Sequence, residues 1–246
     1  MLQPEKTDLV LTYLEEHRSA SVKQIAKDLF MSETTVRRTL TLLEQQHIVR
    51  RSYGFAVLLK YRNNTIPINL RRNDYRKEKA AIAAKAVNLI KTGDTIFIDE
   101  SSTSGIIAEL LDPSLEITVV TNSLATAGIL ADKRIRTYCT GGLILPDTAS
   151  FVGNLPELLI NVINADICFF SSSGISENGL ICDQMAENAQ TKRAMLSHSA
   201  RKVYLCDHSK FDSSYTFIIS SAADIDCLIS DTEPPEKLKN LFKEIV

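Results

Sequence analysis

SVKQIAKDLFMSETTVRRTL, residues 21–40, is the stretch that decides the fold of the first part of this chain. Ser21 followed by Gln24 has capping-box spacing, in which side chains satisfy the unpaired amides at a helix start. Apolar residues then recur at helical spacing, namely Val22, Ile25, Ala26 and Leu29. Phe30-Met31 interrupts the pattern, so we predict a short helix followed by a tight turn.

A second helix is predicted to begin at Ser32, whose hydroxyl can cap it. Val36, Leu40 and Leu43 recur at i, i+4 and i+7 and should face inward. The opposite face then carries hydroxyl and guanidinium groups, which meet phosphates and base edges in a DNA major groove. We therefore predict DNA contacts from Ser32, Thr34, Thr35, Arg37 and Arg38, with Arg37 at the edge of that face. The alternative is an ordinary helical hairpin with a solvated face.

The flanking residues complete a winged helix-turn-helix domain over residues 1–58. Residues 5–18 predict a first helix, with an apolar stripe of Leu9, Val10, Tyr13 and Leu14. Residues 47–58 hold two β-prone runs around Tyr53-Gly54, which predict a hairpin. Arg50 and Arg51 lie at its base, and we expect them to reach DNA phosphates; the alternative is that they are only solvated.

Charge is divided unequally along the chain. Residues 1–80 carry 15 Lys and Arg against 9 Asp and Glu, a net charge of +6, and the remainder carries 13 against 21, a net charge of −8. A basic first part on an acidic body suits binding of double-stranded DNA by one end only. The overall net charge of −2 argues against a protein that coats nucleic acid along its whole surface.

Length and composition set the remaining frame. At 246 residues two domains are expected. No apolar run approaches the ~18–20 residues of a membrane span, and the first ten residues lack a signal-peptide core, so we expect a cytoplasmic protein without membrane contact. The five cysteines are odd in number and form no CxxC pair. The four histidines are scattered, so we predict neither a metal site nor a cofactor.

The second domain, residues 75–246, alternates strand-prone and helix-prone segments after a linker at 59–74. Strands are predicted at 95–99, 117–121, 135–141, 166–171, 202–207 and 227–231. Helices are predicted at 75–91, 103–111, 123–131, 187–199 and from about residue 235. Short apolar strands that alternate with helices are typical of a mostly parallel sheet covered on both faces. The predicted fold class is therefore α/β, with a winged helix-turn-helix domain followed by a larger, mostly parallel α/β domain.

The ends of these strands are rich in small polar residues. In open α/β sheets, ligands bind beyond the carboxyl ends of the strands, where hydroxyls and glycine-exposed amides can bind anions. We predict a small phosphorylated or polyhydroxyl ligand there, with Lys210 as the phosphate counter-charge; the alternative is that Lys210 pairs with Asp207 or Asp212. The candidate residues are Asp99, Ser101, Ser102, Thr103, Ser104, Thr121, Asn122, Ser123, Gly141, Gly142, Ser172, Gly174, Asp207 and Lys210.

Motifs along nearly the whole chain carry a family resemblance. The helix from Ser32 matches S-x-x-T-[IV]-R-R-x-L at Ser32, Thr35, Val36, Arg37, Arg38 and Leu40. Further pieces follow in order: GDTIFID at 93–99 with Thr103, VVTNS at 119–123, Gly141-Gly142, SFVG at 150–153, SSGI at 172–175, KRAM at 192–195, DHSKF at 207–211 and DIDCLISD at 224–231. The chain thereby resembles the DeoR family of bacterial transcriptional regulators. The resemblance implies a sensor domain that is similar to ribose-5-phosphate isomerase and binds sugar phosphates.

Several positions depart from the pattern of that family. Thr39 stands where a recognition-helix Asp is usual, and Gly54-Phe55-Ala56 replaces Gly-Gly-Ala in the wing. In the second domain the common D-x-G-T-T becomes Asp99-Glu100-Ser101-Ser102-Thr103, Ser171 replaces another glycine, and Asn188 aligns with a common Glu. A side chain in place of glycine narrows the space for close backbone approach at a phosphate loop. We therefore expect the effector to differ from the usual one of the family, or effector sensing to be weaker.

Two classes of function compete, a DNA-binding regulator and a sugar-phosphate isomerase-like enzyme. An isomerase needs a positioned general base, and Asn188 removes one candidate carboxylate. We therefore predict a transcription factor, a repressor of a carbohydrate-use operon whose effector is a phosphorylated sugar. We expect a homo-oligomer, a dimer or tetramer, formed by residues 75–246, because one winged domain has a small footprint on DNA. A regulator whose second domain serves only oligomerisation is the remaining alternative.

Overall fold

The computed structural model describes residues 3–17, 19–45, 48–52, 54–58 and 68–246. The chain divides into two compact units, residues 1–74, here called the head, and residues 75–246, here called the body. Each unit has its own hydrophobic core. Across the described ranges, no helix is both long enough and apolar enough to cross a membrane.

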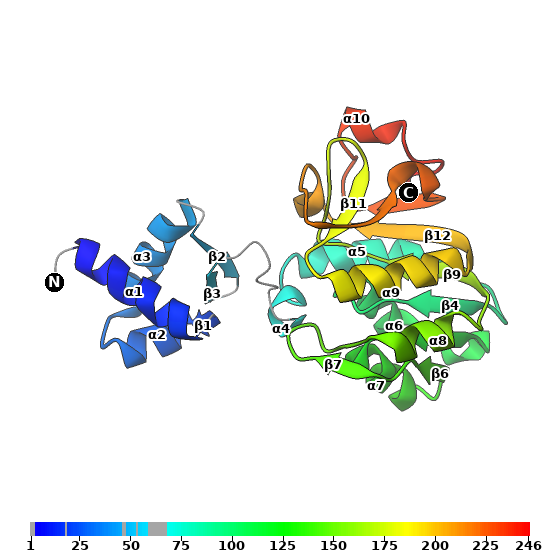
Figure 1. Ribbon diagram of the computed structural model, residues 1–246, viewed down its shortest axis with the longest axis horizontal. Helices are drawn as coiled ribbons and strands as arrows, with labels where there is room; N and C mark the ends of the chain where they lie inside the picture. The colour runs from blue at the N-terminus through cyan, green and yellow to red at the C-terminus, as the bar shows by residue number, and fades with distance from the viewer. Residues whose placement is uncertain (1–2, 18, 46–47, 53, 59–67) are drawn as a thin grey trace. The chain divides into compact units, whose positions relative to one another are not determined.

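The head is a winged helix-turn-helix domain, as predicted (Figure 1). Its elements are α1 (Gln3–His17), β1 (Ser19–Ser21), α2 (Val22–Asp28), α3 (Glu33–Gln45), β2 (Val49–Ser52) and β3 (Phe55–Leu58), followed by α4 (Ile68–Arg71). The strands form an antiparallel sheet in the order β1-β3-β2. Ser21 accepts a hydrogen bond from the amide of Gln24 at 3.0 Å, which confirms the predicted helix start. Val36, Leu40 and Leu43 are fully buried in the core.

Two elements of the head were not predicted. β1 has only three residues and pairs with β3 from Ser19↔Val57 to Ser21↔Phe55, and three residues are too few to show an alternating pattern. α4 is a single turn inside the segment that the sequence analysis treated as linker. Of the predicted linker 59–74, residues 59–67 lie outside the described ranges.

The body is built on a six-stranded parallel sheet, which confirms the predicted fold class (Figure 1). Its strands run in the order β14-β12-β9-β4-β5-β6. Their bounds are β4 (Thr95–Ile98), β5 (Thr118–Thr121), β6 (Arg136–Cys139), β9 (Ala165–Phe170), β12 (Ser199–Cys206) and β14 (Cys227–Ser230). Because the strands are parallel, the residues that follow β12, β9, β4 and β5 meet at one edge of the sheet.

Helices cover both faces of this sheet, because alternate strand residues are apolar on each side. Ile96 and Ile98 belong to one core, together with side chains of α5 (Arg76–Val87), α6 (Ser104–Leu110) and α7 (Leu124–Asp132). Phe97 belongs to the core on the opposite face, here called the second core, together with side chains of α8 (Asn154–Ile160), α9 (Ala186–Ser197) and α10 (Glu236–Lys239). The predicted C-terminal helix is thus only the short α10, and α9 ends before Ser199, which begins β12.

Smaller elements complete the body, and the sequence analysis did not predict them. β7 (Leu143–Leu145) and β8 (Ser150–Val152) form a hairpin. β10 (Gly174–Ile175), β11 (Leu180–Asp183) and β13 (Phe217–Ser221) form an antiparallel sheet in the second core. Three 3₁₀ turns are η1 (Pro113–Leu115), η2 (His208–Lys210) and η3 (Ala222–Asp224). At two to five residues, these segments lack a readable periodicity.

Candidate functional site

One face of α3 carries the side chains that the sequence analysis assigns to DNA. Ser32 caps the helix, since its Oγ accepts a hydrogen bond from the Thr35 amide at 3.2 Å and lies 2.8 Å from the Thr35 hydroxyl. Thr34, Arg37 and Arg38 are exposed, and Thr35 is half-buried. The buried apolar stripe lies on the other side of the helix. The head can therefore offer this polar face to a partner without disturbing its core.

The residues around Arg38 differ in how they are engaged. Arg37 pairs with Glu33 at 3.2 Å, and both side chains are exposed. Such a pair contributes only about 0.3–0.5 kcal/mol, so a phosphate can replace the carboxylate. Thr39, by contrast, is fully buried, and its hydroxyl has no hydrogen-bond partner within the described ranges. The departure from the family pattern at Thr39 thus alters the core side of α3, and not its exposed face.

The two arginines of the wing have different surroundings. On β2 they alternate, with Arg50 opposite Val57 and Arg51 opposite Ala56. The amide of Arg51 donates to Glu44 at 2.9 Å, and its guanidinium contacts both that carboxylate and the hydroxyl of Thr41 on α3. Arg51 therefore ties the wing to α3, and Arg50, on the other side of the strand, is the better phosphate candidate.

Asp99 follows β4 and is the centre of a buried hydrogen-bond network at the carboxyl edge of the sheet. Its Oδ1 accepts from the amide of Ser101 at 3.1 Å and from the hydroxyl of Ser104. Its Oδ2 accepts from the amide of Ser171, after β9, at 3.1 Å. The hydroxyls of Ser101 and Ser104 lie 2.7 Å apart. Two hydroxyls predicted to bind an effector are therefore engaged within their own loop.

Lys192 of α9 lies among three carboxylates next to this network. Its Nζ is 2.6 Å from Asp183, 2.9 Å from Glu100 and 3.5 Å from Asp99. All four side chains are buried, and they are called the Lys192 cluster below. With every group ionised, the cluster would have a net charge of −2 in a site shielded from water.

Burial and mutual charge alter the acidity of the Lys192 cluster. Burial raises the pKa of Glu100 above its usual range, and the neighbouring carboxylates add to this effect against the opposing charge of Lys192. Burial alone would lower the pKa of Lys192, but the three carboxylates raise it, so the ammonium form persists. Burial alone would likewise raise the pKa of Asp183, whereas Lys192 holds it below its usual range. Of the carboxylates Glu100 and Asp183, Glu100 therefore retains a proton more readily.

Asn122, after β5, extends the cluster toward the β7–β8 hairpin. Its side-chain Nδ2 donates to Glu100 at 3.2 Å, and its backbone carbonyl accepts from the amide of Phe151 at 2.7 Å. Ser150 donates to Oδ1 of the buried Asn188 on α9 at 3.0 Å. Asn188 thus takes part as a neutral amide and adds no further carboxylate at this edge.

Lys210 reaches the same edge from the turn after β12. Its Nζ donates to Oγ of Ser171 at 2.5 Å and forms an ion pair with Oδ2 of Asp207 at 3.6 Å. Its side chain is 14% exposed. Burial alone would raise the pKa of Asp207, but the Lys210 ammonium contributes to holding it below its usual range. Lys210 and Asp99 therefore flank Ser171, and the pairing of Lys210 with Asp207 is also present.

Other predicted residues have local roles. Ser123 caps α7 by accepting from the amide of Thr126 at 3.2 Å, and its own amide donates to Thr121 at 3.1 Å. The hydroxyl of Ser172 lies 2.6 Å from that of Tyr204, in the second core. These polar atoms already have partners in the protein, which weakens their assignment to an effector.

Two of the three predicted glycines, Gly142 and Gly174, serve close packing. Gly141 and Gly142 have positive φ angles of 66° and 110°. A Cβ on Gly142 would lie 2.9 Å from the carbonyl of Val152, and one on Gly174 would lie 2.7 Å from Ser213. Gly142 and Gly174 are therefore required by the approach of neighbouring backbone, independently of any ligand.

Four buried polar atoms at the carboxyl ends of the strands have no hydrogen-bond partner in the part of the chain that the structure describes. They are Oγ1 of Thr103, Oδ1 of Asn122, Oγ1 of Thr140 and Oδ2 of Asp207, the last of which has the ion pair with Lys210 at 3.6 Å but no hydrogen bond. Ser102 is buried beside Thr103. An unpaired buried polar group costs about 1–3 kcal/mol, so a polar ligand that reaches these atoms gains more here than at an exposed surface.

Both units match domains of one family of regulators. The DeoR-like helix-turn-helix domain matches residues 7–62, and the DeoR C terminal sensor domain matches residues 74–232. The chain belongs to the DeoR family. The body of this DeoR-family regulator is therefore its sensor domain, and the head is its DNA-binding domain.

Related regulators align over almost the full chain. GolR, an HTH-type transcriptional regulator of Listeria innocua, is 31% identical over 98% of this chain and 95% of its own length. The L-fucose operon activator of Haemophilus influenzae is 32% identical over 97% and 96%. The transcriptional repressor GlcR of Bacillus subtilis is 30% identical over 98% and 93%. The DeoR-family protein is accordingly a DNA-binding regulator and not an enzyme of the isomerase class.

Lys192, Glu100 and Asp183 are the part of the DeoR-family sensor site that sequence reasoning missed, although it predicted their neighbour Asp99. KRAM at 192–195 was noted only as a matching motif. Asn188, Lys192, Met195 and Leu196 lie at helical spacing and are all buried. A lysine within such a stripe must pair with buried carboxylates, and this was the available signal. Among the described residues, no group of three His, Cys, Asp or Glu side chains could hold a metal ion.

Proposed function

We propose that this DeoR-family regulator represses a carbohydrate-use operon and that a sugar phosphate, bound beyond the carboxyl ends of β4, β5, β9 and β12, controls its affinity for operator DNA. The observation that carries the proposal is the set of buried polar atoms without a hydrogen-bond partner at the edge of the sheet that also holds the Lys192 cluster and Lys210. Regulators of sugar operons among its relatives support the choice of ligand class.

Charge at the proposed site assigns the two halves of a sugar phosphate to different residues. The Lys192 cluster holds more carboxylates than ammonium groups, so it disfavours an anion and can accept hydrogen bonds from sugar hydroxyls. Lys210 is the partly exposed cation at the same edge, and an ammonium can meet a phosphate as a point charge. We assign the hydroxyls to the cluster and the phosphate to Lys210.

α5 is the proposed relay between the effector and the head, because it begins where the body begins. The ring of Tyr75, which caps α5, makes an edge-to-face contact with His208 at 5.1 Å between centroids. His208 and Lys210 belong to the same turn, η2. Lys79 of α5 also lowers the pKa of Asp207. A phosphate that draws Lys210 away from Asp207 would therefore change the contacts of the first turn of α5.

The proposed regulation requires two arrangements of paired heads. A ligand shifts an equilibrium only by its differential affinity for the two states. The effector must therefore favour one arrangement and operator DNA the other. We propose at least a dimer, held together by the body, because paired half-sites are the usual route to affinity for winged domains.

Titration of a sugar-phosphate panel tests this proposal. A sugar phosphate that raises the melting temperature of the protein should also change the affinity for operator DNA in a gel-shift titration at fixed salt. Linkage requires DNA to change the affinity for the sugar phosphate by the same factor. A ligand that binds without any effect on DNA affinity contradicts the regulatory part of the proposal.

A sensor that serves only oligomerisation is the second candidate, and one observation favours it. Ser101 and Ser171, which replace glycines of the family pattern, direct their hydroxyls to Ser104, Leu205 and Lys210 within the site. If this closes the site, no sugar phosphate shifts the melting temperature while operator binding stays intact. A thermal shift by one member of the panel excludes this candidate.

A further inference from the structure

α8 carries apolar side chains on two sides. Ile160 is buried in the second core, and Pro156 is also buried. Leu155 and Leu158 lie on its outer side and are 59% and 64% exposed; Val162, in the turn after the helix ends at Ile160, continues this outer stripe and is 79% exposed. A helix that is apolar on opposite sides is normally buried on both. The outer stripe therefore lacks a cover within the described part of the chain.

The β7–β8 hairpin and β6 extend this stripe into a larger surface. A Cβ on Gly142 would lie 3.0 Å from Pro156 of α8, so the start of the hairpin packs on that helix. Exposed apolar side chains follow at once in β7, and Tyr138 on β6 is also exposed. We call this surface the apolar face: Tyr138, Leu155, Leu158 and Val162, with one side of the β7–β8 hairpin beside it, since the consecutive residues Leu143 and Ile144 point to opposite sides of the hairpin.

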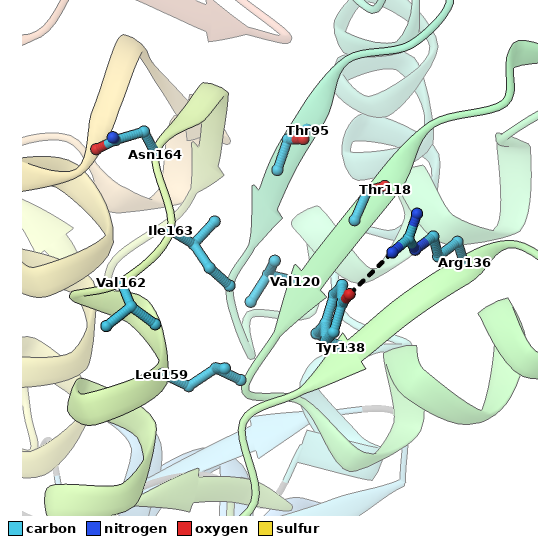
Figure 2. Close-up of a pocket in the computed structure, with 9 residues that line it drawn as sticks. All are labelled: Thr95, Thr118, Val120, Arg136, Tyr138, Leu159, Val162, Ile163 and Asn164. Carbon is cyan, nitrogen blue, oxygen red and sulfur yellow. Dashed lines mark hydrogen bonds between the residues drawn. The ribbon is translucent and has the colours of Figure 1, made fainter.

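A cleft of about 520 Å³ lies beside the stripe, between the end of α8 and the strands β4, β5 and β6. Figure 2 shows Leu159, Val162 and Ile163 on one side of it and Val120 and Tyr138 on the other. None of the effector candidates lines it. Parallel sheets are normally covered on both faces, yet this end of the sheet face is left open beside α8.

The two outermost strands of the large sheet, β14 and β6, have different neighbours. At β14 the C-terminal residues add a further ladder, in which the Leu228 amide donates to Glu244 and the Val246 amide donates to Leu228, both at 2.9 Å. At β6 the sheet ends with no further strand among the described residues. Edge strands attract pairing unless they are covered. The apolar face and the open cleft thus adjoin the uncovered edge.

Charge favours a second copy of this chain as the partner. Residues 81–246 have a net charge of −8, so two bodies repel each other over most of their surfaces. Residues 142–163 contain only two charged side chains, Asp147 and Glu157, and the cleft beside them contains Arg136. Two copies can approach here with little like-charge repulsion.

We propose that the apolar face is the surface through which two bodies pair. The pairing has two-fold symmetry, so that leucines of the outer stripe of each copy enter the cleft of the other. Such an interface needs a protrusion and a complementary hollow on the same surface; the outer side of α8 provides the protrusion, and the adjoining cleft provides the hollow. The proposal rests on the proposed function in one respect, since paired heads require paired bodies.

The test compares the mass of full-length variants by light scattering at micromolar concentration. Leu158→Glu and Val162→Glu each place a charge in the interface and should raise the dissociation constant for self-association at least 100-fold. Leu110→Glu is the matched control, because Leu110 is 46% exposed at the end of α6, outside the apolar face. A monomeric wild type, or the same loss of mass in Leu110→Glu, overturns the proposal.

A second measurement covers the case in which the charged variants do not fold. Cys139 is exposed and the other four cysteines are buried, so Leu158→Cys in a Cys139→Ser background gives one reactive thiol. Pairing through the apolar face predicts that its maleimide labelling slows as protein concentration rises. A labelling rate that does not change with concentration, in a protein that is oligomeric, overturns the proposal.

The sugar-phosphate response separates this proposal from the proposed function. Leu158→Glu should lose self-association and retain any thermal shift that a sugar phosphate produces in the wild type. If the wild type pairs through the apolar face but shows no thermal shift with any sugar phosphate, only the proposed effector is contradicted. Variants that keep full mass and the thermal shift count against the apolar face only.

Discussion

The exposed face of α3 and the carboxyl edge of the large sheet are both rich in Ser, Thr and charged residues, but they use them in opposite ways. Thr34, Arg37 and Arg38 are exposed on a helix whose stability comes from its other side. Asp99 and Lys192 are buried and hold several strand ends together. The same residue types are thus exposed to solvent in one unit and hold the fold together in the other.

This difference predicts which substitutions separate binding from stability. On α3, a side chain can be removed without leaving a buried group unpaired. At the edge of the sheet, removal of one partner leaves the others buried without compensation. The five predictions below test this contrast, from the largest expected effect to the smallest.

Lys192→Met should strongly destabilise the body, because it leaves three carboxylates buried without their ammonium partner. Loss of one partner from a buried ionic group costs about 3–5 kcal/mol. Urea unfolding followed by circular dichroism measures this effect. Lys237→Met, which removes an exposed lysine paired with Glu177, is the control and should leave the unfolding midpoint nearly unchanged. A midpoint equal to that of the wild type in Lys192→Met would show that the cluster does not hold the strand ends.

Arg38→Ala should weaken operator binding and leave unfolding unchanged. If Arg38 contacts a base, the loss should be about 1–3 kcal/mol and confined to one position of the operator. Gel-shift titrations at fixed salt, with single base changes in the operator, measure both quantities. An unaltered affinity would remove Arg38 from the DNA interface, and a lowered unfolding midpoint would break the contrast between the two regions.

Lys210→Ala should abolish the effect of the sugar phosphate on DNA binding while leaving DNA affinity without ligand nearly unchanged. Coupling energies between sites are typically about 1–3 kcal/mol, so the response to be lost is a 5- to 150-fold change at most. Parallel gel shifts with and without the sugar phosphate measure it. Lys243→Ala, which removes an exposed lysine paired with the half-buried Asp226, is the control. Equal responses in wild type and Lys210→Ala would eliminate Lys210 as an effector contact.

Glu100→Gln should alter the pH dependence of stability. The pKa of Glu100 is raised in the folded state, so the folded protein binds this proton more tightly than the unfolded chain. The resulting stabilisation is present below the ordinary pKa of about 4.5 and is lost as pH rises through the raised value. The urea midpoint of unfolding should therefore decrease less between pH 5 and pH 8 in Glu100→Gln than it does in the wild type. Glu116→Gln, at an exposed position, should follow the wild type.

Arg50→Ala and Arg51→Ala should differ by a small amount. Arg50→Ala should weaken binding to all DNA sequences alike. It should also reduce the slope of log affinity against log salt concentration by about 1, as expected for a phosphate contact. Arg51→Ala should lower head stability by at most about 1 kcal/mol, since its contacts with Glu44 and Thr41 are partly exposed. Salt titrations and thermal melts of the two variants give the comparison. Identical behaviour would show that the contact of Arg51 with α3 has no consequence.

Much of the architecture follows from local patterns in the sequence. The apolar period of residues 32–43 determines which face of α3 is buried, and the alternation of strands and helices after residue 75 determines a parallel sheet. Parallel strands then bring Asp99, Asn122 and Asp207 to one edge, whatever their distance in the chain. These conclusions need only the spacing of apolar residues along one segment.

The tertiary structure decides the partners. Lys192 meets Asp99 and Glu100 from more than ninety positions away, and Ser171 lies between Asp99 and Lys210. A serine after a strand can cap a helix, bind a ligand or satisfy a neighbouring strand, and its local sequence is the same in all three cases. Which of these it does depends on the group that lies nearest in space, because hydrogen bonds and buried charges act over a few ångströms and not along the chain.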